Sequence, residues 1–171
     1  IYTIRAFANM LKEGVQANLT LIGDGHTRKE CENLVNEMGL SGNVIFPGKK
    51  PVNEIPGYMK KADVFVHHSV TSSDGDTEGI PTVIMEAMAS GLPVITTRHS
   101  GIPELVVDGK SGFMVEEKDV DSYTEKMIEI AGNREMRISM GRFNRDRIVR
   151  DFNMEIQNGE LKRLYYEVLE E

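Results

Sequence analysis

The chain has 171 residues and a formal net charge of −7, with 40% hydrophobic and 27% charged residues. The acidic balance argues against a nucleic-acid-binding surface, which is normally basic. The single cysteine, Cys31, excludes an intrachain disulfide and favours a reducing compartment. No apolar run approaches the roughly 18 residues that a membrane-spanning helix needs. The length suffices for one domain with a real core.

Short apolar runs alternate along the chain with stretches of helical periodicity. Strands are expected at residues 19–22, 44–46, 64–66, 94–96 and 112–115. Helices are expected at 1–13, 27–38, 55–62, 82–89, 103–107 and 120–130, with two more helical stretches to the C-terminus. Strands that alternate with helices indicate parallel βαβ units. The sequence therefore predicts an α/β fold with a doubly wound, Rossmann-like parallel sheet.

Two local patterns make further structural predictions. Thr27 followed by Glu30 fits a capping box at the start of the second helix, and Gly39 fits its C-terminal glycine. The charged region 133–171 carries spaced apolar residues, which predict a pair of surface helices that pack one face and expose the other. These apolar residues are Ile148, Phe152, Ile156, Leu161, Leu164, Tyr165 and Val168.

Ligands of doubly wound sheets bind at the carboxyl ends of the strands. Three loops that leave predicted strands, at 23–25, 47–51 and 69–78, should therefore converge on one face. The turn Gly23-Asp-Gly25 fits a tight strand-to-helix connection better than a backbone approach to a ligand, although both remain open. His67 and His68 end a strand, so at most one faces the cleft. Pocket-wall or core packing is favoured over a catalytic role for either.

The segment from Glu78 to Thr97 holds the sharpest site signal. Residues 82–89 are almost entirely apolar, which predicts a short helix buried nearly all round with Pro81 as its first residue. Glu86 within that run would be costly to bury unless a partner satisfies it. The helix N-terminus after Glu78 suits a phosphate. Two carboxylates beside an anion site favour a ligand with hydroxyls and phosphate, whereas the purely structural alternative has both carboxylates serving the backbone.

The run Glu78-Gly-Ile-Pro-x4-Glu86-Ala-Met-Ala-x-Gly-x-Pro-Val-Ile resembles the E-x7-E signature of the retaining GT-B glycosyltransferases of family 4. The resemblance covers residues 1–131 in order, and the loop 72–81 is particularly similar to exopolysaccharide enzymes of the colanic-acid type. The other matching segments are Leu21-Ile-Gly-Asp-Gly25, Val44-Ile-Phe-Pro-Gly48, Ala62-Asp-Val-Phe-Val66, His99-Ser-Gly-Ile-Pro-Glu-Leu-Val106 and Gly109-Lys-Ser-Gly-Phe-Met-Val115.

The resemblance implies a role for each matching position. Glu86 would bind the two ribose hydroxyls of a nucleotide-sugar. Glu78, the candidate catalytic residue, would contact hydroxyls of the donor sugar and orient it, although it is not assigned as a nucleophile. The donor diphosphate would be held by the amides of Gly79, Ile80 and Thr82 and by the Thr82 hydroxyl.

Two further points follow from the same resemblance. The loop around Lys49 and Lys50 would border the base, with Lys50 as the candidate contact. Many relatives carry Phe-Gly where this chain has Ile80-Pro81, so one potential phosphate donor is lost because proline has no N–H.

The resemblance also implies that part of the family pattern lies outside this chain. Residues 1–171 would form the donor-binding domain alone, with a Rossmann-like core at 1–131 and C-terminal helices at 132–171. The acceptor-binding N-terminal domain, and a first strand ending in Gly-Arg with a nearby Lys-Gly, are absent from this sequence. That strand is expected between those at 19–22 and 64–67, so the sheet should be gapped or completed by another segment. The isolated chain is expected to be inactive.

The function implied is transfer of a sugar from a nucleoside diphosphate to a saccharide or lipid-linked acceptor in polysaccharide biosynthesis. No cofactor or metal is expected, and the location implied is cytoplasmic, with peripheral association at the inner face of the cell membrane left open for the full-length enzyme. A GT-B-fold nucleotide-sugar epimerase and a non-catalytic nucleotide-sugar-binding module are the alternatives. The base, sugar, acceptor and linkage are not specified by these residues.

Overall fold

The computed structural model describes residues 1–71, 75 and 79–170. The strands within these ranges are β1 (Leu19–Ile22), β2 (Val44–Gly48), β3 (Phe65–His67), β4 (Val94–Thr97) and β5 (Gly112–Val115). All their pairings are parallel, as predicted. They form two sheets, ordered β1-β2 and β3-β4-β5. Among the described residues β1 and β3 therefore do not pair, which agrees with the predicted gap between them.

Helices connect the strands and continue to the end of the chain. They are α1 (Tyr2–Lys12), α2 (Arg28–Glu37), the 3₁₀ turn η1 (Val52–Glu54), α3 (Ile55–Met59), α4 (Thr82–Ala89), α5 (Ile102–Leu105), α6 (Val120–Gly132), α7 (Arg134–Asp151) and α8 (Met154–Glu170). Each helix predicted from periodicity is present, within a few residues of its expected bounds.

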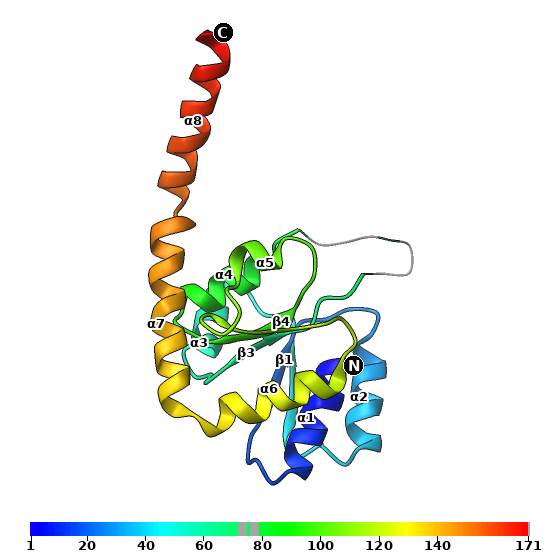
Figure 1. Ribbon diagram of the computed structural model, residues 1–171. Helices are drawn as coiled ribbons and strands as arrows, with labels where there is room; N and C mark the ends of the chain where they lie inside the picture. Colours follow the sequence, from blue (N-terminus) through cyan, green and yellow to red (C-terminus); the bar gives the residue numbers. More distant parts are fainter. Residues whose placement is uncertain (72–74, 76–78, 171) are drawn as a thin grey trace.

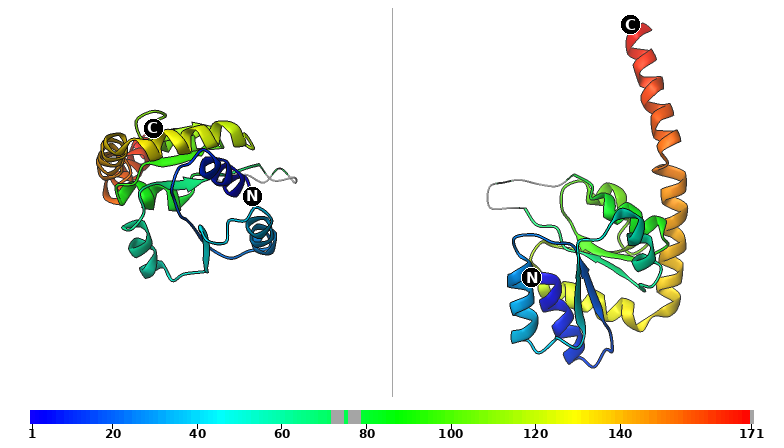
Figure 2. Two further views of the ribbon diagram at one scale, coloured as in Figure 1. Left: turned by 90° about the horizontal axis from the view of Figure 1, so that it is seen from below. Right: turned by 180° about the vertical axis from the view of Figure 1, so that it is seen from behind.

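The strand β4 separates two apolar layers. Adjacent residues of a strand point to opposite faces, and Val94 and Ile95 are both fully buried. Ile95 belongs to the larger cluster, with residues of α1 and α6. Val94 belongs to the second cluster, which contains Ile84 of α4 and Leu105 of α5. Helices thus cover both faces of this sheet, as a doubly wound fold requires (Figures 1 and 2).

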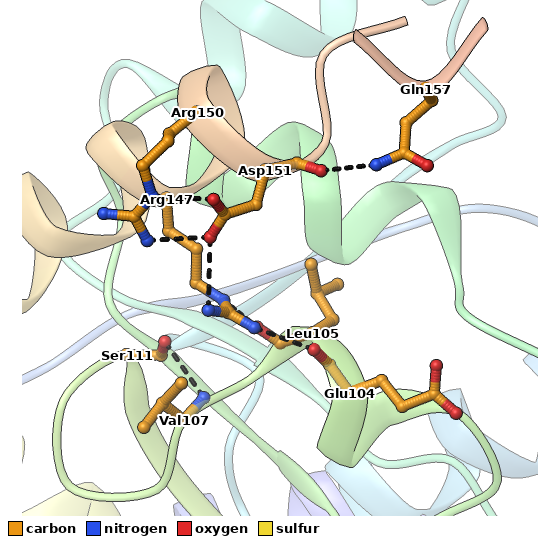
Figure 3. Close-up of polar contacts among 8 residues, drawn as sticks. All are labelled: Glu104, Leu105, Val107, Ser111, Arg147, Arg150, Asp151 and Gln157. Atoms are coloured by element: carbon orange, nitrogen blue, oxygen red, sulfur yellow. Dashed lines mark hydrogen bonds and ion pairs between the residues drawn. The ribbon is translucent and has the colours of Figure 1, made fainter. Parts of the chain in front are cut away.

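The helix α7 is fastened to the layer that holds α4 and α5. Gly141 lies so close to the turn after α4 that a Cβ there would come within 2.1 Å of the Gly91 carbonyl oxygen. Arg147 caps the end of α5, because its Nε donates to Leu105 O at 3.0 Å and its Nη2 to Glu104 O at 2.9 Å (Figure 3). These contacts fix α5 and the end of α4 against one helix.

The prediction that both C-terminal helices pack on the domain is wrong for α8. This helix extends away from the rest of the chain (Figures 1 and 2), and Tyr165 and Leu169 remain 65% and 78% exposed. Ile156, Leu161, Leu164 and Val168 are exposed as well. Ile148 and Phe152, at the end of α7, do pack against the second cluster. Among the described residues, no helix is both long and apolar enough to cross a bilayer.

Helix ends confirm the predicted glycine and correct the predicted cap. Gly39 follows α2 with φ of +70°, as expected of a C-terminal glycine. Thr27 is the N-cap residue of α2, but its side chain makes no capping hydrogen bond within the described residues. It has helical dihedrals, which turn the hydroxyl away from the capping geometry. Side-chain caps occur instead at Asp119 and Asn133, which accept from Ser122 N and Met136 N.

Candidate functional site

The candidate site is built around the first turns of α4. The helix buries Ile84, Ala87 and Met88, whereas Thr82 and Glu86 are exposed. Residues four apart share a face of a helix, so these two side chains lie together on the outer face. The prediction of a helix buried nearly all round was therefore wrong. Glu86 does not need an internal partner, and its carboxylate is accessible to a ligand.

The helix begins one residue later than predicted. Pro81 is the N-cap residue with φ −61° and ψ 120°, and its carbonyl accepts from Ile84 N at 3.0 Å. Because Thr82 is then the first helical residue, its amide is among those that no residue of the helix can pair. An exposed hydroxyl and an unpaired helical amide at the same residue form a suitable anchor for an anion.

The turn before α4 is backed by the loop that follows β4. Gly79 is exposed and Ile80 half-buried. A Cβ on Gly101 would meet Ile80 Cγ1 at 2.8 Å and the Gly79 carbonyl carbon and oxygen at 3.5 Å, so a larger residue there would force the Ile80 side chain to shift. Ser100, the preceding residue, has φ of +45°, an uncommon conformation for a non-glycine residue. The backbone at 100–101 thus supports the turn at 79–80.

The predicted catalytic residue, Glu78, lies outside the described residues, as does most of the predicted loop 69–78. The described beginning of that loop is tied to two other loops. The Glu117 carboxylate accepts from Thr71 N at 2.8 Å and from Thr71 Oγ1 at 3.1 Å. Its Oε1 also lies 2.7 Å from Nδ1 of His99, whose side chain is 2% exposed. One carboxylate therefore joins the loops that follow β3, β4 and β5.

This carboxylate is strongly acidic in the folded chain. The hydrogen bond from His99, followed by the one from Thr71 N, lowers the pKa of Glu117 to about 2. Both donors favour the ionised form, which accepts and does not donate. These hydrogen bonds therefore favour the charged form of Glu117 at neutral pH.

His68 is a packing residue, as the sequence analysis favoured. Its ring stacks on Tyr2 with centroids 4.9 Å apart and meets Tyr123 edge-on at the same distance. Its Nε2 accepts from Lys118 N at 3.0 Å, which places the ring proton on Nδ1. Burial lowers the pKa of His68 to about 4. His67 ends β3 with its ring stacked on Phe65.

The buried imidazole predicts acid sensitivity of the fold. Because the unfolded chain takes up a proton on His68 near pH 6.5 and the folded chain only near pH 4, the free energy of unfolding should fall as the pH drops from about 7 to about 4. His68→Gln keeps an acceptor for Lys118 N and removes the titrating group, so it should flatten this dependence. Urea unfolding at several pH values measures it.

The exposed His26 supplies the matched control for that experiment. His26→Gln should leave the pH dependence as it is in the parent chain. A fold whose stability falls equally steeply after His68→Gln would contradict the assignment of this acid sensitivity to His68.

The other two predicted loops meet each other beside α2. Gly23 N donates to Gly48 O at 3.1 Å, and Arg28 Nη2 donates to Phe46 O at 3.4 Å. Within the turn, Gly25 N donates to Asp24 Oδ1 at 3.0 Å. An open hollow of about 250 Å³ lies here, lined by residues of α1, β1, β2 and α2.

Lys50 follows β2 and is engaged locally. Its Nζ lies 3.9 Å from Glu54 Oε2, and about a quarter of its side chain is exposed. A weak, partly exposed ion pair of this kind costs little to break, so Lys50 retains the freedom to contact a ligand. No described contact joins Lys50 or the loop 23–25 to the first turn of α4.

The Glu117 cluster was missed by the sequence analysis. Glu117 lies in a charged run, Glu116-Glu117-Lys118-Asp119, in which nothing distinguishes one carboxylate from the next. His99 begins one of the segments that match the family pattern, but its position in that segment indicates no partner. The partners are 18 and 46 positions apart, so the contacts of Glu117 become visible only in the fold.

A family model for "Glycosyl transferases group 1" matches residues 1–147. The chain belongs to this family. A protein of Salmonella typhimurium named as a colanic acid biosynthesis glycosyltransferase, WcaL, is 36% identical over 94% of the chain and 40% of its own length. The amylovoran biosynthesis glycosyltransferase AmsK of Erwinia amylovora is 32% identical with the same coverage. The chain thus spans about 40% of the length of these curated relatives.

Solved structures share the fold. Anabaena HepE, determined in complex with UDP and glucose, superposes with a TM-score of 0.83 at 22% identity, covering 97% of this chain and 44% of HepE. The C-terminal domain of the Francisella tularensis group 1 glycosyl transferase LpcC has a TM-score of 0.76 at 26% identity, covering 90% of this chain and 78% of that one. The predicted GT-B-type α/β fold is confirmed.

Proposed function

We propose that this chain is the nucleotide-sugar-binding domain of a retaining glycosyltransferase, one that moves a sugar from a nucleoside diphosphate to a saccharide or lipid-linked acceptor during polysaccharide synthesis. The observation that carries the proposal is the exposed pair Thr82 and Glu86, one turn apart at the start of α4. A hydroxyl beside unpaired helix amides suits a phosphate, and a carboxylate one turn further suits a diol. The names of WcaL and AmsK support exopolysaccharide synthesis as the setting.

Each site residue has a distinct part in this proposal. Glu86 accepts hydrogen bonds from the two ribose hydroxyls. The diphosphate lies against the amides of Gly79, Ile80 and Thr82, where the helix dipole favours negative charge. Glu78 contacts hydroxyls of the donor sugar and orients it. Lys50 borders the base.

Catalysis in this proposal rests on positioning and on stabilising the charge of the departing diphosphate. The chain's own contribution is the amide-rich start of α4, because the Gly-Arg and Lys-Gly positions of the family pattern are not in this sequence. We therefore propose that residues 1–171 bind the donor without transferring its sugar, that no metal or cofactor takes part, and that an acceptor-binding domain completes the enzyme on the cytoplasmic side of the membrane.

Replacing the ribose acceptor tests the proposal directly. Glu86→Ala should weaken binding of the preferred nucleoside diphosphate by about 100-fold or more, because two hydrogen bonds to a charged acceptor are lost together. Isothermal titration of the parent and variant chains with UDP, GDP and ADP, followed by their sugar conjugates, measures the loss and identifies the base.

Glu125→Ala is the matched control, because Glu125 is an exposed glutamate on α6. It should bind as the parent does. Equal affinity of the parent and the Glu86→Ala chain would refute the ribose role, and a parent chain that binds none of the three diphosphates would refute the proposed function.

A further inference from the structure

Glu117 contacts Thr71, which precedes the segment 72–78, and is linked through His99 to the turn that follows this segment. On the N-terminal side it accepts two hydrogen bonds from Thr71, at 2.8 and 3.1 Å. On the C-terminal side it acts through His99, whose Nδ1 lies 2.7 Å from Glu117 Oε1. The loop from His99 to Gly101 then packs on the turn at Gly79 and Ile80.

The path from Glu117 to that turn is short and rigid. His99 is almost fully buried, so its ring cannot swing into solvent. Its carbonyl accepts from Ile102 N at 3.0 Å, which starts α5, and α5 is held at its other end by Arg147. Gly101 lies between these fixed points. A Cβ added there would be 2.8 Å from Ile80 Cγ1, so the loop and the turn are in close contact.

We propose that Glu117 is a positioning residue of the nucleotide-sugar site, which is itself oriented by Thr71 and holds the diphosphate-binding turn at Gly79 and Ile80 in place through His99 and the loop 99–101. The inference rests on the proposed function of that turn and goes beyond it, since it assigns a role to a residue that the ligand need not touch. Its action is to keep the two amides aimed at one point.

The neighbouring Glu116 carries the same negative charge as Glu117 but lacks its contacts with Thr71 and His99. Glu116 is 72% exposed, and among the described side chains it pairs at 3.6 Å with Arg98, which is itself exposed and bonded to Asp108. Glu117, by contrast, has three donors on two separate loops, and these donors keep its pKa near 2. Two adjacent glutamates of the same charge thus provide a variant and a matched control.

The test compares Glu117→Ala with Glu116→Ala in the protein at its full natural length. The readout is the ratio of affinities for UDP and UMP, repeated with GDP and GMP and with ADP and AMP. Loss of alignment at the turn should weaken diphosphate binding about tenfold, the size of effect that removing charge-assisted hydrogen bonds produces, while monophosphate binding, dominated by the ribose contact, changes less. Glu116→Ala should keep the parent ratio.

A second pair of measurements separates positioning from general loss of structure. Thr71→Val, which removes only the hydroxyl partner, should reduce the same ratio by a smaller factor, and its effect should not add to that of Glu117→Ala because both variants act through one contact. Amide hydrogen exchange should accelerate at 69–71 and at the Gly79 and Ile80 amides in Glu117→Ala and remain at the parent rate in α6.

The outcomes distinguish this inference from the proposed function. If Glu86→Ala abolishes binding and Glu117→Ala keeps the parent diphosphate-to-monophosphate ratio, the positioning role is overturned and the proposed function stands. If the parent protein binds no nucleotide, the proposed function is refuted, and the role of Glu117 in it is refuted as well. Unchanged exchange at the Gly79 and Ile80 amides in Glu117→Ala, measured without any ligand, would also overturn the inference.

Discussion

Gly112→Ala should destabilise the chain severely. Gly112 begins β5 with φ of +145°, a conformation that side-chain-bearing residues rarely adopt. A Cβ at this position would lie 1.8 Å from Val94 O, 2.6 Å from Val94 C and 2.7 Å from Val94 N. Backbone atoms of a paired strand cannot move aside as a side chain can, so the strands must separate.

The expected cost is large compared with the stability of a domain. Overpacking and a forbidden backbone conformation together should remove about 3 kcal/mol or more, against a typical total of about 5–15 kcal/mol. Val94 starts β4, whose far end leads to His99 and the loop behind the candidate site. Loss of the β4–β5 pairing should therefore abolish nucleotide binding as well. Soluble yield and urea unfolding followed by circular dichroism measure the effect.

Gly132→Ala is the matched control for this substitution. Gly132 ends α6 and has open space around it, and its φ is not positive. Alanine there should be neutral or stabilise the helix by up to about 1 kcal/mol. A Gly112→Ala chain within 1 kcal/mol of the parent, on the order of one ordinary surface substitution, would contradict the close approach of β5 to the Val94 backbone.

Local patterns were sufficient to predict the order of the elements. Runs such as Val94-Ile-Thr-Thr97 are β-branched and short, and glycines such as Gly39 mark helix ends by a conformation that few other residues adopt. Such signals depend on neighbours in the sequence. They can therefore be interpreted from the sequence without knowing the tertiary contacts.

The exposure of Glu86 was not predicted, because the high apolar content of α4 made it difficult to identify the exposed face of this helix. Ile84, Ala87 and Met88 are the buried set, at spacings of three, four and one, which is an ordinary helix stripe. The half-exposed Val83 and Met85 made the run read as apolar on every side. Periodicity, weighed above composition, would have left Thr82 and Glu86 on the outer face.

The C-terminal helix α8 illustrates a different limit. Its apolar residues predict a partner, but their spacing says nothing of where the partner lies, and in this structure the helix has none within the described residues that covers Tyr165 or Leu169. The Glu117 cluster had no local signal at all. Contacts between residues that lie tens of positions apart depend on the fold, so no short stretch of the sequence predicts them.

Asn144→Ala should destabilise the chain by about 2–4 kcal/mol. Asn144 is fully buried on α7, and its Nδ2 donates to Leu92 O and to Ser111 O, both at 2.7 Å. These carbonyls precede β4 and β5, so one amide joins α7 to the starts of two neighbouring strands. Removing it takes one donor from each carbonyl, although Ser111 O keeps the hydrogen bond from Val94 N, and leaves a cavity.

The near-isosteric Asn144→Asp separates the hydrogen bonds from the packing. It keeps the volume but exchanges the donor for an acceptor that faces two carbonyl oxygens, so it should be at least as destabilising as alanine when measured by urea unfolding at neutral pH. Asn158→Ala, on the exposed part of α8, is the control and should be neutral or slightly stabilising, since alanine favours a helix. An Asn144→Asp chain as stable as the parent would show that the donor is dispensable, and the attachment of α7 to β4 and β5 would then have to rest on its apolar contacts and on Arg147.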